Sequence, residues 1–204
     1  MAINKTLQKR ILLSIFGVLF GGFSVGFFKA SEMGTDPFQT FVAGILNVAN
    51  INFGTLYVII NAILLLLIFI INKKYIHIAT FINLFLLGYV VDFSYSSILH
   101  LFPNASILLK LVFLIIGFIG LCFGSSLYIT ANLGVSTYDA IALHISNKYN
   151  FSFKYCRIIS DLICVGIGFV LSAPIGIGTV LTAFCMGPLI YIFNQKICSK
   201  ILNQ

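Results

Sequence analysis

Hydrophobic residues occur along this chain in long stretches, and each stretch is separated from the next by a short polar piece. Six stretches are close to the roughly 20 residues that cross a bilayer as a helix, and two are much shorter. The pattern of long, short, long and long stretches occurs twice. It predicts an all-α membrane protein with about six transmembrane helices, and the stretches lie at 11–31, 37–49, 54–72, 76–93, 107–130, 137–147, 155–172 and 175–194.

Two polar breaks of similar composition follow the first and the fifth stretches. The first reads Gly-Thr-Asp-Pro-Phe-Gln-Thr over 34–40. The second, one hundred positions later, reads Gly-Val-Ser-Thr-Tyr-Asp-Ala over 134–140. Matching breaks in matching places predict that the chain consists of two repeats.

Both breaks can begin a helix. Asp36 is a favourable N-cap with Pro37 at the first helical position, and Ser136 is an N-cap with Asp139 three residues later, as in a capping box. The stretches that follow have only about twelve residues, which as helix cover about 18 Å of a 30 Å hydrocarbon core. We therefore expect two short re-entrant helices. The alternative is a turn at the membrane edge that caps an interfacial helix.

Three spanning helices in each half would turn the second half upside down relative to the first, so inverted topology is favoured. Cytoplasmic loops are rich in Lys and Arg, and with the N-terminus inside only Lys29 and Lys110 of the twelve basic residues fall outside. Both termini are then cytoplasmic. The single membrane domain divides into repeat one, a linker, repeat two and a cytoplasmic tail at about 9–93, 94–106, 107–194 and 195–204.

Composition narrows the class of protein. Of the 204 residues, 60% are hydrophobic and 8% are charged, which indicates a multi-pass protein whose first partner is the lipid bilayer. The net charge of +7 does not indicate nucleic acid binding, because the basic residues stand singly or in pairs at the ends of apolar stretches. The five cysteines and three histidines lack metal-ligand spacing. We expect no metal and no cofactor.

All five acidic residues lie within or at the edge of apolar stretches. A carboxylate in the bilayer core costs at least about 2.5 kcal/mol unless it is paired, protonated or facing water, so such residues are functional candidates. Asp161 lies four residues after Arg157 and can either pair with it or carry a proton. Asp36 and Asp139 differ because they occupy the two breaks. The candidates for proton or ion coupling are therefore Asp36, Asp139 and Asp161.

Inverted repeats would bring the two breaks face to face across a pseudo-twofold axis. Helix N-termini there would attract an anionic group and carboxylates a cation or proton, so we expect a small polar, anionic or zwitterionic solute, possibly proton coupled. In the alternative, the acids only cap their own helices. The expected substrate-binding residues are Gly34, Asp36, Pro37, Gln39, Gly134, Ser136, Tyr138 and Asp139.

Other small residues predict close helix packing. Gly17 and Gly21 are four apart in the first stretch, while Gly176, Gly178 and Thr179 open the last one. Small residues let helix backbones approach each other in membranes. The glycines that open the last stretch are no dinucleotide fingerprint, because no strand precedes them. No Ser/His/Asp or Cys/His arrangement appears, so we expect that the protein is not an enzyme.

These motifs together resemble the YczE/YyaS/YitT group of bacterial integral membrane proteins, most closely its YczE-like members. The resemblance covers nearly the whole chain and rests on the pieces at 33–38, 133–140, 176–179 and 187–188. Thr137 stands where such proteins often have proline. The resemblance implies a protein of the bacterial cytoplasmic membrane and suggests small-molecule transport.

We therefore expect a small secondary carrier that holds its solute between the two breaks, with Asp36 or Asp139 taking part in binding or proton coupling. A homodimer is compatible with this expectation. The alternative, from another class, is a non-enzymatic binding or regulatory membrane subunit that works with a partner protein, such as the capture component of an energised importer. The length of the chain and its number of spans suit both.

Overall fold

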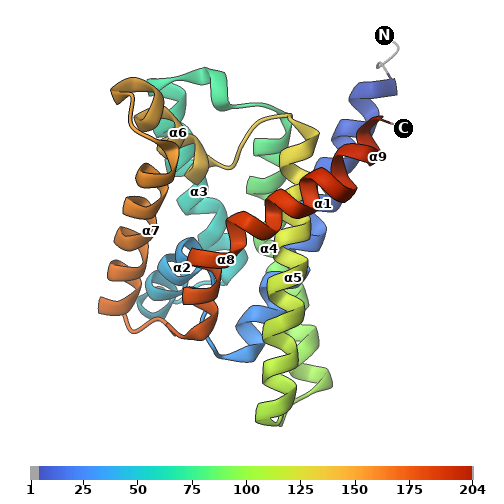
Figure 1. Cartoon of the computed structure of the whole chain (residues 1–204). Coiled ribbons are helices and arrows are strands. Elements are labelled where there is room, and N and C mark those ends of the chain that lie inside the picture. The colour runs from blue at the N-terminus through green and yellow to red at the C-terminus, as the bar shows by residue number, and fades with distance from the viewer. Residues whose placement is uncertain (1–4, 204) are drawn as a thin grey trace.

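The computed structural model describes residues 5–203, and every regular element within that range is helical. The helices follow the order that the hydrophobic pattern predicts, in which a long helix, a short one and two longer ones occur twice (Figure 1). Their bounds are α1 (Lys5–Ser31), α2 (Pro37–Val48), α3 (Phe53–Ile71), the 3-10 turn η1 (Lys73–Tyr75), α4 (Ile78–Leu101), α5 (Ile107–Ala131), α6 (Thr137–Tyr149), α7 (Phe153–Val170), α8 (Ile177–Phe193), the π-helical turn η2 (Asn194–Cys198) and α9 (Ser199–Asn203).

Among the described residues, five helices are long and apolar enough to cross a membrane: α1, α3, α4, α5 and the continuous helix from α8 into α9. Their outer faces expose large apolar side chains, for example Ile70, Leu108 and Phe184. A surface of this kind suits hydrocarbon and not water. The chain is thus an all-helical, multi-pass membrane protein. The sixth predicted span is α7, an 18-residue helix that carries Arg157 and Asp161.

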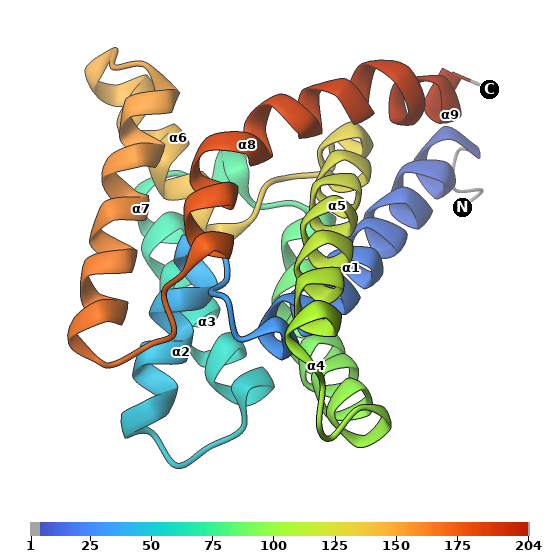
Figure 2. The ribbon, with the colours of Figure 1, turned by 60° about the horizontal axis from the view of Figure 1, so that its bottom comes forward.

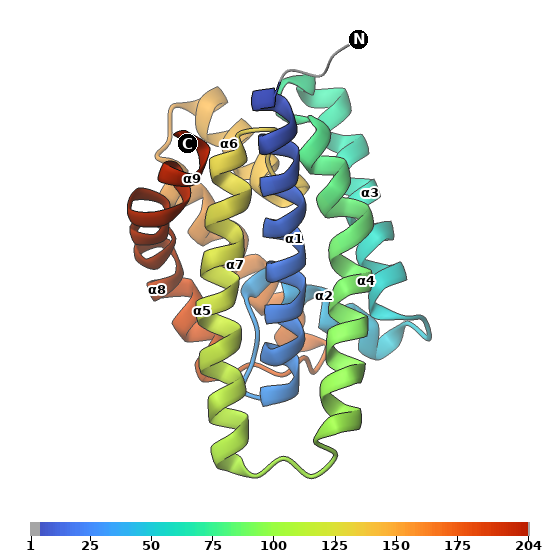
Figure 3. The ribbon, with the colours of Figure 1, turned by 90° about the vertical axis from the view of Figure 1, so that its right-hand side faces the viewer.

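The connections between helices lie at two opposite ends of the molecule. Figure 1 shows the start of α1, α9, the α3–α4 connection and the α6–α7 connection at one end, at the top of the view. The α4–α5 connection lies at the other end, as Figure 3 shows. Lys73, Lys74 and Lys148 belong to the first end, whereas Lys29 and Lys110 lie in the turns of α1 and α5 nearest the second.

Helices α1 and α5 run antiparallel and touch along their backbones (Figure 3). A Cβ added to Gly17 would lie 2.8 Å from the Gly124 oxygen, and one added to Gly117 would lie 2.9 Å from the Ser24 oxygen. The residue numbers of these contacts increase along α1 as they decrease along α5. A Cβ on Gly124 would also come within 2.6 Å of the Gly21 nitrogen. Only residues without a side chain permit this approach.

Each break docks on the start of the last helix of the opposite half. The Met33 carbonyl accepts a hydrogen bond from the Gly178 amide at 2.8 Å. In the second break, the Leu133 carbonyl accepts one from the Ala79 amide at 3.0 Å. Met33 and Leu133 are one hundred positions apart. The two halves therefore hold each other by the same contact, made twice.

Glycine is required in both breaks. Gly34 has φ of +88° and Gly134 has φ of +111°, conformations that other residues adopt only with strain. Space is also limited, because a Cβ on Gly34 would lie 2.5 Å from the Gly176 nitrogen and one on Gly134 would lie 2.8 Å from Thr80 Oγ1. Both glycines thus shape the docked breaks.

Helix α8 bends where its counterpart α4 continues straight (Figure 2). Pro188 lies inside α8. Proline lacks a backbone N–H and its ring clashes with the preceding turn, so it bends a helix. After the bend, α8 swings across the end of α5 towards the start of α1.

Two helices run beyond the boundaries that the sequence predicts. α4 continues to Leu101, so only 102–106 of the expected linker 94–106 is non-helical. The serines of this region favour a loop, but Ser94 and Ser97 donate to the Phe23 and Phe93 carbonyls at 3.0 and 2.7 Å and so remain satisfied within helices. The expected tail 195–204 is helical as far as Asn203.

Candidate functional site

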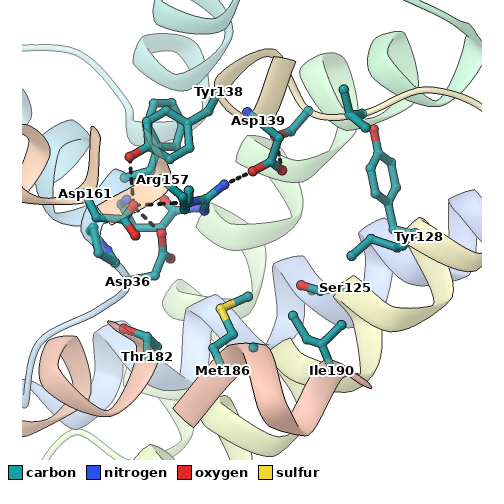
Figure 4. Close-up of a pocket in the computed structure, with 18 of the residues that line it drawn as sticks. Asp36, Ser125, Tyr128, Tyr138, Asp139, Arg157, Asp161, Thr182, Met186 and Ile190 are labelled. Atoms are coloured by element: carbon teal, nitrogen blue, oxygen red, sulfur yellow. Dashed lines mark hydrogen bonds and ion pairs between the residues drawn. The ribbon is translucent and has the colours of Figure 1, made fainter. Parts of the chain in front are cut away.

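A cavity of about 770 Å³ lies between the two breaks, with α5 and α8 along one side. In Figure 4, Asp36, Tyr138, Arg157 and Asp161 gather across the cavity from Tyr128. The predicted residues that line it are Gly17, Gly21, Asp36, Pro37, Gln39, Ser136, Tyr138, Asp139 and Asp161. The predicted residues that lie elsewhere, where the breaks dock on the two last helices, are Gly34, Gly134, Gly176, Gly178 and Thr179.

Residues one hundred positions apart line this cavity from both halves. The rings of Phe38 and Tyr138 stack with their centroids 4.8 Å apart, so the two halves meet at this pair. Beside the stack, the Tyr57 ring lies 6.0 Å from Phe38 and the Arg157 guanidinium lies 4.5 Å above Tyr138. The matched lining positions are 36 and 136, 38 and 138, 39 and 139, 57 and 157, and 61 and 161.

Arg157 is the centre of the second half's contribution. Its guanidinium pairs with Asp139 on α6, and its Nε lies 3.3 Å from Oδ1 of Asp161, one turn along α7. The Tyr138 hydroxyl donates to the same Asp161 oxygen at 2.8 Å. Ring, guanidinium and two carboxylates thus hold one another in a fixed arrangement (Figure 4).

The two short helices are capped as their sequences predict. Asp36 Oδ1 accepts a hydrogen bond from the Gln39 amide at 3.2 Å. Ser136 Oγ accepts from the Asp139 amide at 3.1 Å and donates to Asp139 Oδ2 at 2.6 Å. These caps occupy amides that would otherwise attract an anionic ligand. Fewer backbone amides are therefore available to an anion at the helix N-termini than the sequence alone indicates.

Carboxylates outnumber cations in the cavity. The charged residues among its described lining are Asp36, Asp139, Asp161 and Arg157, which together carry a formal charge of −2 when all are ionised. Charges kept from water and not paired cost about several kcal/mol each. The cavity is therefore stabilised by taking up a cation or protons.

Apart from Asp36, the first half contributes neutral polar groups to the cavity. Gln39 is 6% exposed, and its Oε1 makes no hydrogen bond with the described residues. The hydroxyl of Tyr128, on α5 of the second half, is likewise buried and makes no hydrogen bond of standard geometry with the described residues, although the Thr80 side chain is its neighbour. Asn61 differs, because its Oδ1 accepts from Thr137 Oγ1 at 2.5 Å. Buried polar atoms are normally hydrogen-bonded, so the exceptions mark a place for a ligand or water.

Close contact joins α2 to α7 at the end of the molecule opposite the termini. A Cβ on Gly44 would lie 3.0 Å from the Gly168 Cα, so the two backbones touch. Asn47 Nδ2 donates to the carbonyls of Leu171 and Ser172 at 2.9 and 3.0 Å. We call this pair of hydrogen bonds the Asn47 latch.

The matching contact joins α6 to α3 and is looser. Asn147, one hundred positions after Asn47, donates from Nδ2 to the Tyr75 hydroxyl at 2.7 Å, beyond the end of α3. We call this bond the Asn147 latch. His144 and Ile68 stand at the positions that match Gly44 and Gly168. Both positions thus carry side chains where the α2–α7 contact has glycines.

Acidic residues outside the cavity have structural partners. Glu32 pairs with Lys110 at 2.5 Å and so ties the end of α1 to the start of α5. Asp92 Oδ2 accepts from the Gly54 amide at 2.6 Å. Within residues 5–203, no three His, Cys, Asp or Glu side chains are grouped so that they could hold a metal ion.

Sequence reasoning assigned Arg157 only to Asp161 and did not place it beside the second break. The offset of one hundred residues aligns Arg157 with Tyr57 of the other half. This match was the sequence signal that could have grouped both residues with the breaks. Tyr128 and the lining residues of α8 had no comparable signal. Their place depends on how the helices pack.

Comparison with known proteins supports the resemblance to YczE and YyaS. The profile of a family described as "Family of unknown function (DUF6198)" matches residues 8–195. "Uncharacterized protein YyaS" of Bacillus subtilis is 24% identical over 188 residues, which are 92% of this chain and 94% of that one. "Uncharacterized membrane protein YczE" of the same organism is 24% identical over 177 residues, which are 86% and 80% of the two chains.

An "Uncharacterized protein" of Haemophilus influenzae is 24% identical over 185 residues, which are 91% of this chain and 83% of that one. No solved structure matches significantly.

Proposed function

We propose that this chain, which belongs to the family described as "Family of unknown function (DUF6198)", is a small secondary carrier of the bacterial cytoplasmic membrane. The observation that carries the proposal is the charged cavity between the two breaks, to which both halves contribute matching positions. Secondary carriers hold their solutes near the middle of the membrane, between broken helices of two repeats.

In this proposal the two halves are inverted repeats. Antiparallel packing of α1 against α5 supports it, as does the crossed docking of the breaks. Backbone conformation supports it too, because Glu32 and Asn132, one hundred positions apart, have φ of +57° and +50° where α1 and α5 end. Helices related in this way cross the membrane in opposite directions.

The short helices α2 and α6 are re-entrant in this proposal, and α7 is the sixth span. α7 has 18 residues, enough to cross most of a hydrocarbon core of about 30 Å, and its Arg157 and Asp161 side chains line the cavity. The basic residues at the end that holds the termini make that end cytoplasmic.

Alternating access follows from the two unequal contacts of the short helices. The α2–α7 contact, with the Asn47 latch, closes the outer side of the cavity, while the looser α6–α3 contact borders its inner side. In an inverted repeat the two contacts can exchange roles. The opposite state would have a tight α6–α3 contact and a released Asn47 latch.

The charges of the cavity revise the solute class. Helix N-termini alone favoured an anionic or zwitterionic solute, but their amides are capped and the lining carries a formal charge of −2. A solute with a cationic group fits better, as a zwitterion or a cation. Asp36, Asp139 and Asp161 then bind that group or exchange protons with it. No residue of this site is assigned to catalysis.

Counterflow tests the proposal directly. Purified protein alone, in liposomes loaded with an unlabelled solute, should accumulate the same labelled solute from a panel of amino acids, amines and organic acids. Asp139→Asn should reduce accumulation, whereas Glu32→Gln, outside the cavity, should not. Binding of a panel member without accumulation of any would replace the carrier by the alternative, a binding or regulatory subunit.

A further inference from the structure

We propose that the cavity binds a small organic cation whose N–H groups donate to the Asp36 carboxylate and to Gln39 Oε1, beside the Phe38–Tyr138 stack. This inference rests on the proposed function, because it names the solute class of the same cavity. It concerns binding, however, and can be tested separately from transport.

Charge balance is the first argument. Arg157 offsets one of the two carboxylates that it contacts, which leaves two negative charges when Asp36, Asp139 and Asp161 are all ionised. Asp36 forms no ion pair with any described residue, and its hydrogen bond comes from a backbone amide. One monocation would offset its charge, and one proton would offset the other.

Unused acceptors are the second argument. Gln39 lines the cavity, and its buried Oε1 accepts no hydrogen bond from the described residues. It follows Asp36 by three residues, so the two acceptors lie on the same turn of backbone. A carbonyl oxygen and a carboxylate together suit a group with several N–H donors, such as an ammonium or guanidinium.

Aromatic rings supply the third argument. Phe38, Tyr57 and Tyr138 all line the cavity, and a ring face attracts a cation within about 6 Å of its centroid. The protein already uses this arrangement once, since the Arg157 guanidinium lies 4.5 Å above Tyr138 between two carboxylates. The same rings lie around Asp36, which forms no ion pair with a cation of the described residues.

Calorimetric titration of the full chain in detergent with ethylammonium and methylguanidinium tests the inference, with acetate as the anionic probe. Both cations should bind saturably and acetate should not. Asp36→Asn should weaken cation binding about tenfold, because it removes the charge from a desolvated ion pair. Asparagine is also a good N-cap, so α2 should keep its start. Gln39→Leu should weaken binding as well.

Glu32→Gln is the matched control, because this acid lies outside the cavity and should leave affinity unchanged. Absence of binding by both cations, or equal affinity in Asp36→Asn and the natural chain, would overturn the inference. Acetate binding that depends on Arg157 would replace it by an anion site. Cation binding without counterflow would support this inference and contradict the proposed carrier function. Counterflow of a solute without any cationic group would support the carrier function and contradict this inference.

Discussion

The two halves of this protein bring the same positions to one cavity but different chemistry. Phe38, Gln39, Tyr57 and Asn61 of the first half are neutral, whereas the matching residues of the second half, Tyr138, Asp139, Arg157 and Asp161, include three charges. The rings at 38 and 138 stack where the two halves meet. At the matched pair 36 and 136 the order is reversed, because Asp36 belongs to the first half and Ser136 to the second. Three of the four charged lining residues therefore come from the second half.

This difference indicates how symmetry and specificity can be combined. In the proposed carrier, movement between two states needs halves that fit together in two equivalent ways, and the matching docking contacts of the two breaks support this. Recognition of one solute needs an asymmetric lining, which the unequal charges of the two halves would provide. Substitutions at matched positions should therefore have unequal effects.

The largest difference is expected between Arg157 and Tyr57. Arg157→Gln leaves Asp139 and Asp161 without their cation, and we expect a loss of about 2 to 3 kcal/mol, less than for a fully buried pair because Arg157 is 30% exposed. Tyr57→Phe removes the hydroxyl that donates to Asn83 and should cost about 1 kcal/mol. Thermal unfolding in detergent measures both. Equal losses would contradict the role of Arg157 as the partner of two carboxylates.

The second largest effect is expected where α2 touches α7. Gly168→Ala would place its Cβ 2.9 Å from the Thr40 oxygen, so we expect a loss of about 2 kcal/mol from overpacking. Gly166→Ala is the control, because its Cβ meets nothing within 4 Å and alanine favours helix. Its midpoint of thermal unfolding should stay or rise. A similar loss in both variants would mean that this contact is not tight.

The threonines at the two docking points give a smaller contrast. Thr80 Oγ1 donates to the Val135 carbonyl at 2.8 Å, whereas Thr179 Oγ1 is buried and has no hydrogen-bond partner in the part of the chain that the structure describes. Thr80→Val should therefore cost about 1 kcal/mol, and Thr179→Val should be neutral or slightly stabilising. Thermal midpoints of the two variants test this. A larger loss in Thr179→Val would contradict the difference between the docking points.

The two latches should give the smallest change in stability but opposite changes in access. Asn47→Ala removes two hydrogen bonds near the surface, at a cost of about 1 kcal/mol, and should open the outer side. Asn147→Ala weakens the α6–α3 contact, so it should favour the state seen in the structure, in which the α2–α7 contact is the tight one. A cysteine at Ser125, which lines the cavity, should react faster with an impermeant reagent added outside only in Asn47→Ala. Mass spectrometry distinguishes the labelled cysteine at position 125 from the native cysteines. Equal labelling rates with and without Asn47→Ala would refute the gating role of the Asn47 latch.

Much of the helix pattern was predictable because bilayer thickness fixes helix length and polar breaks stand out against hydrocarbon. Positions 34–40 and 134–140 were found in this way, and the predicted site includes three of the four charged residues that line the cavity, Asp36, Asp139 and Asp161. The extension of α4 to Leu101 was not, because serines that bond within helices look like a loop in sequence.

The wall formed by α5 and α8 was beyond sequence reasoning for another reason. Pro188 predicts a bend but not its direction, so the sequence does not place Met186 and Ile190 of α8 in the same wall of the cavity as Tyr128 of α5. The partner of Arg157 on α6 was missed because an ion pair between helices depends on their packing. Spacing within one helix reveals only the Asp161 pair.

One measurement tests the inverted arrangement most directly, and the carrier depends on it. Asn50→Cys and Asn150→Cys, made separately, place thiols at exposed positions just beyond α2 and α6. In intact cells, a membrane-impermeant maleimide should label position 50 from outside, and position 150 only after the cells are opened. Labelling of both positions from the same side would mean that the halves are not inverted.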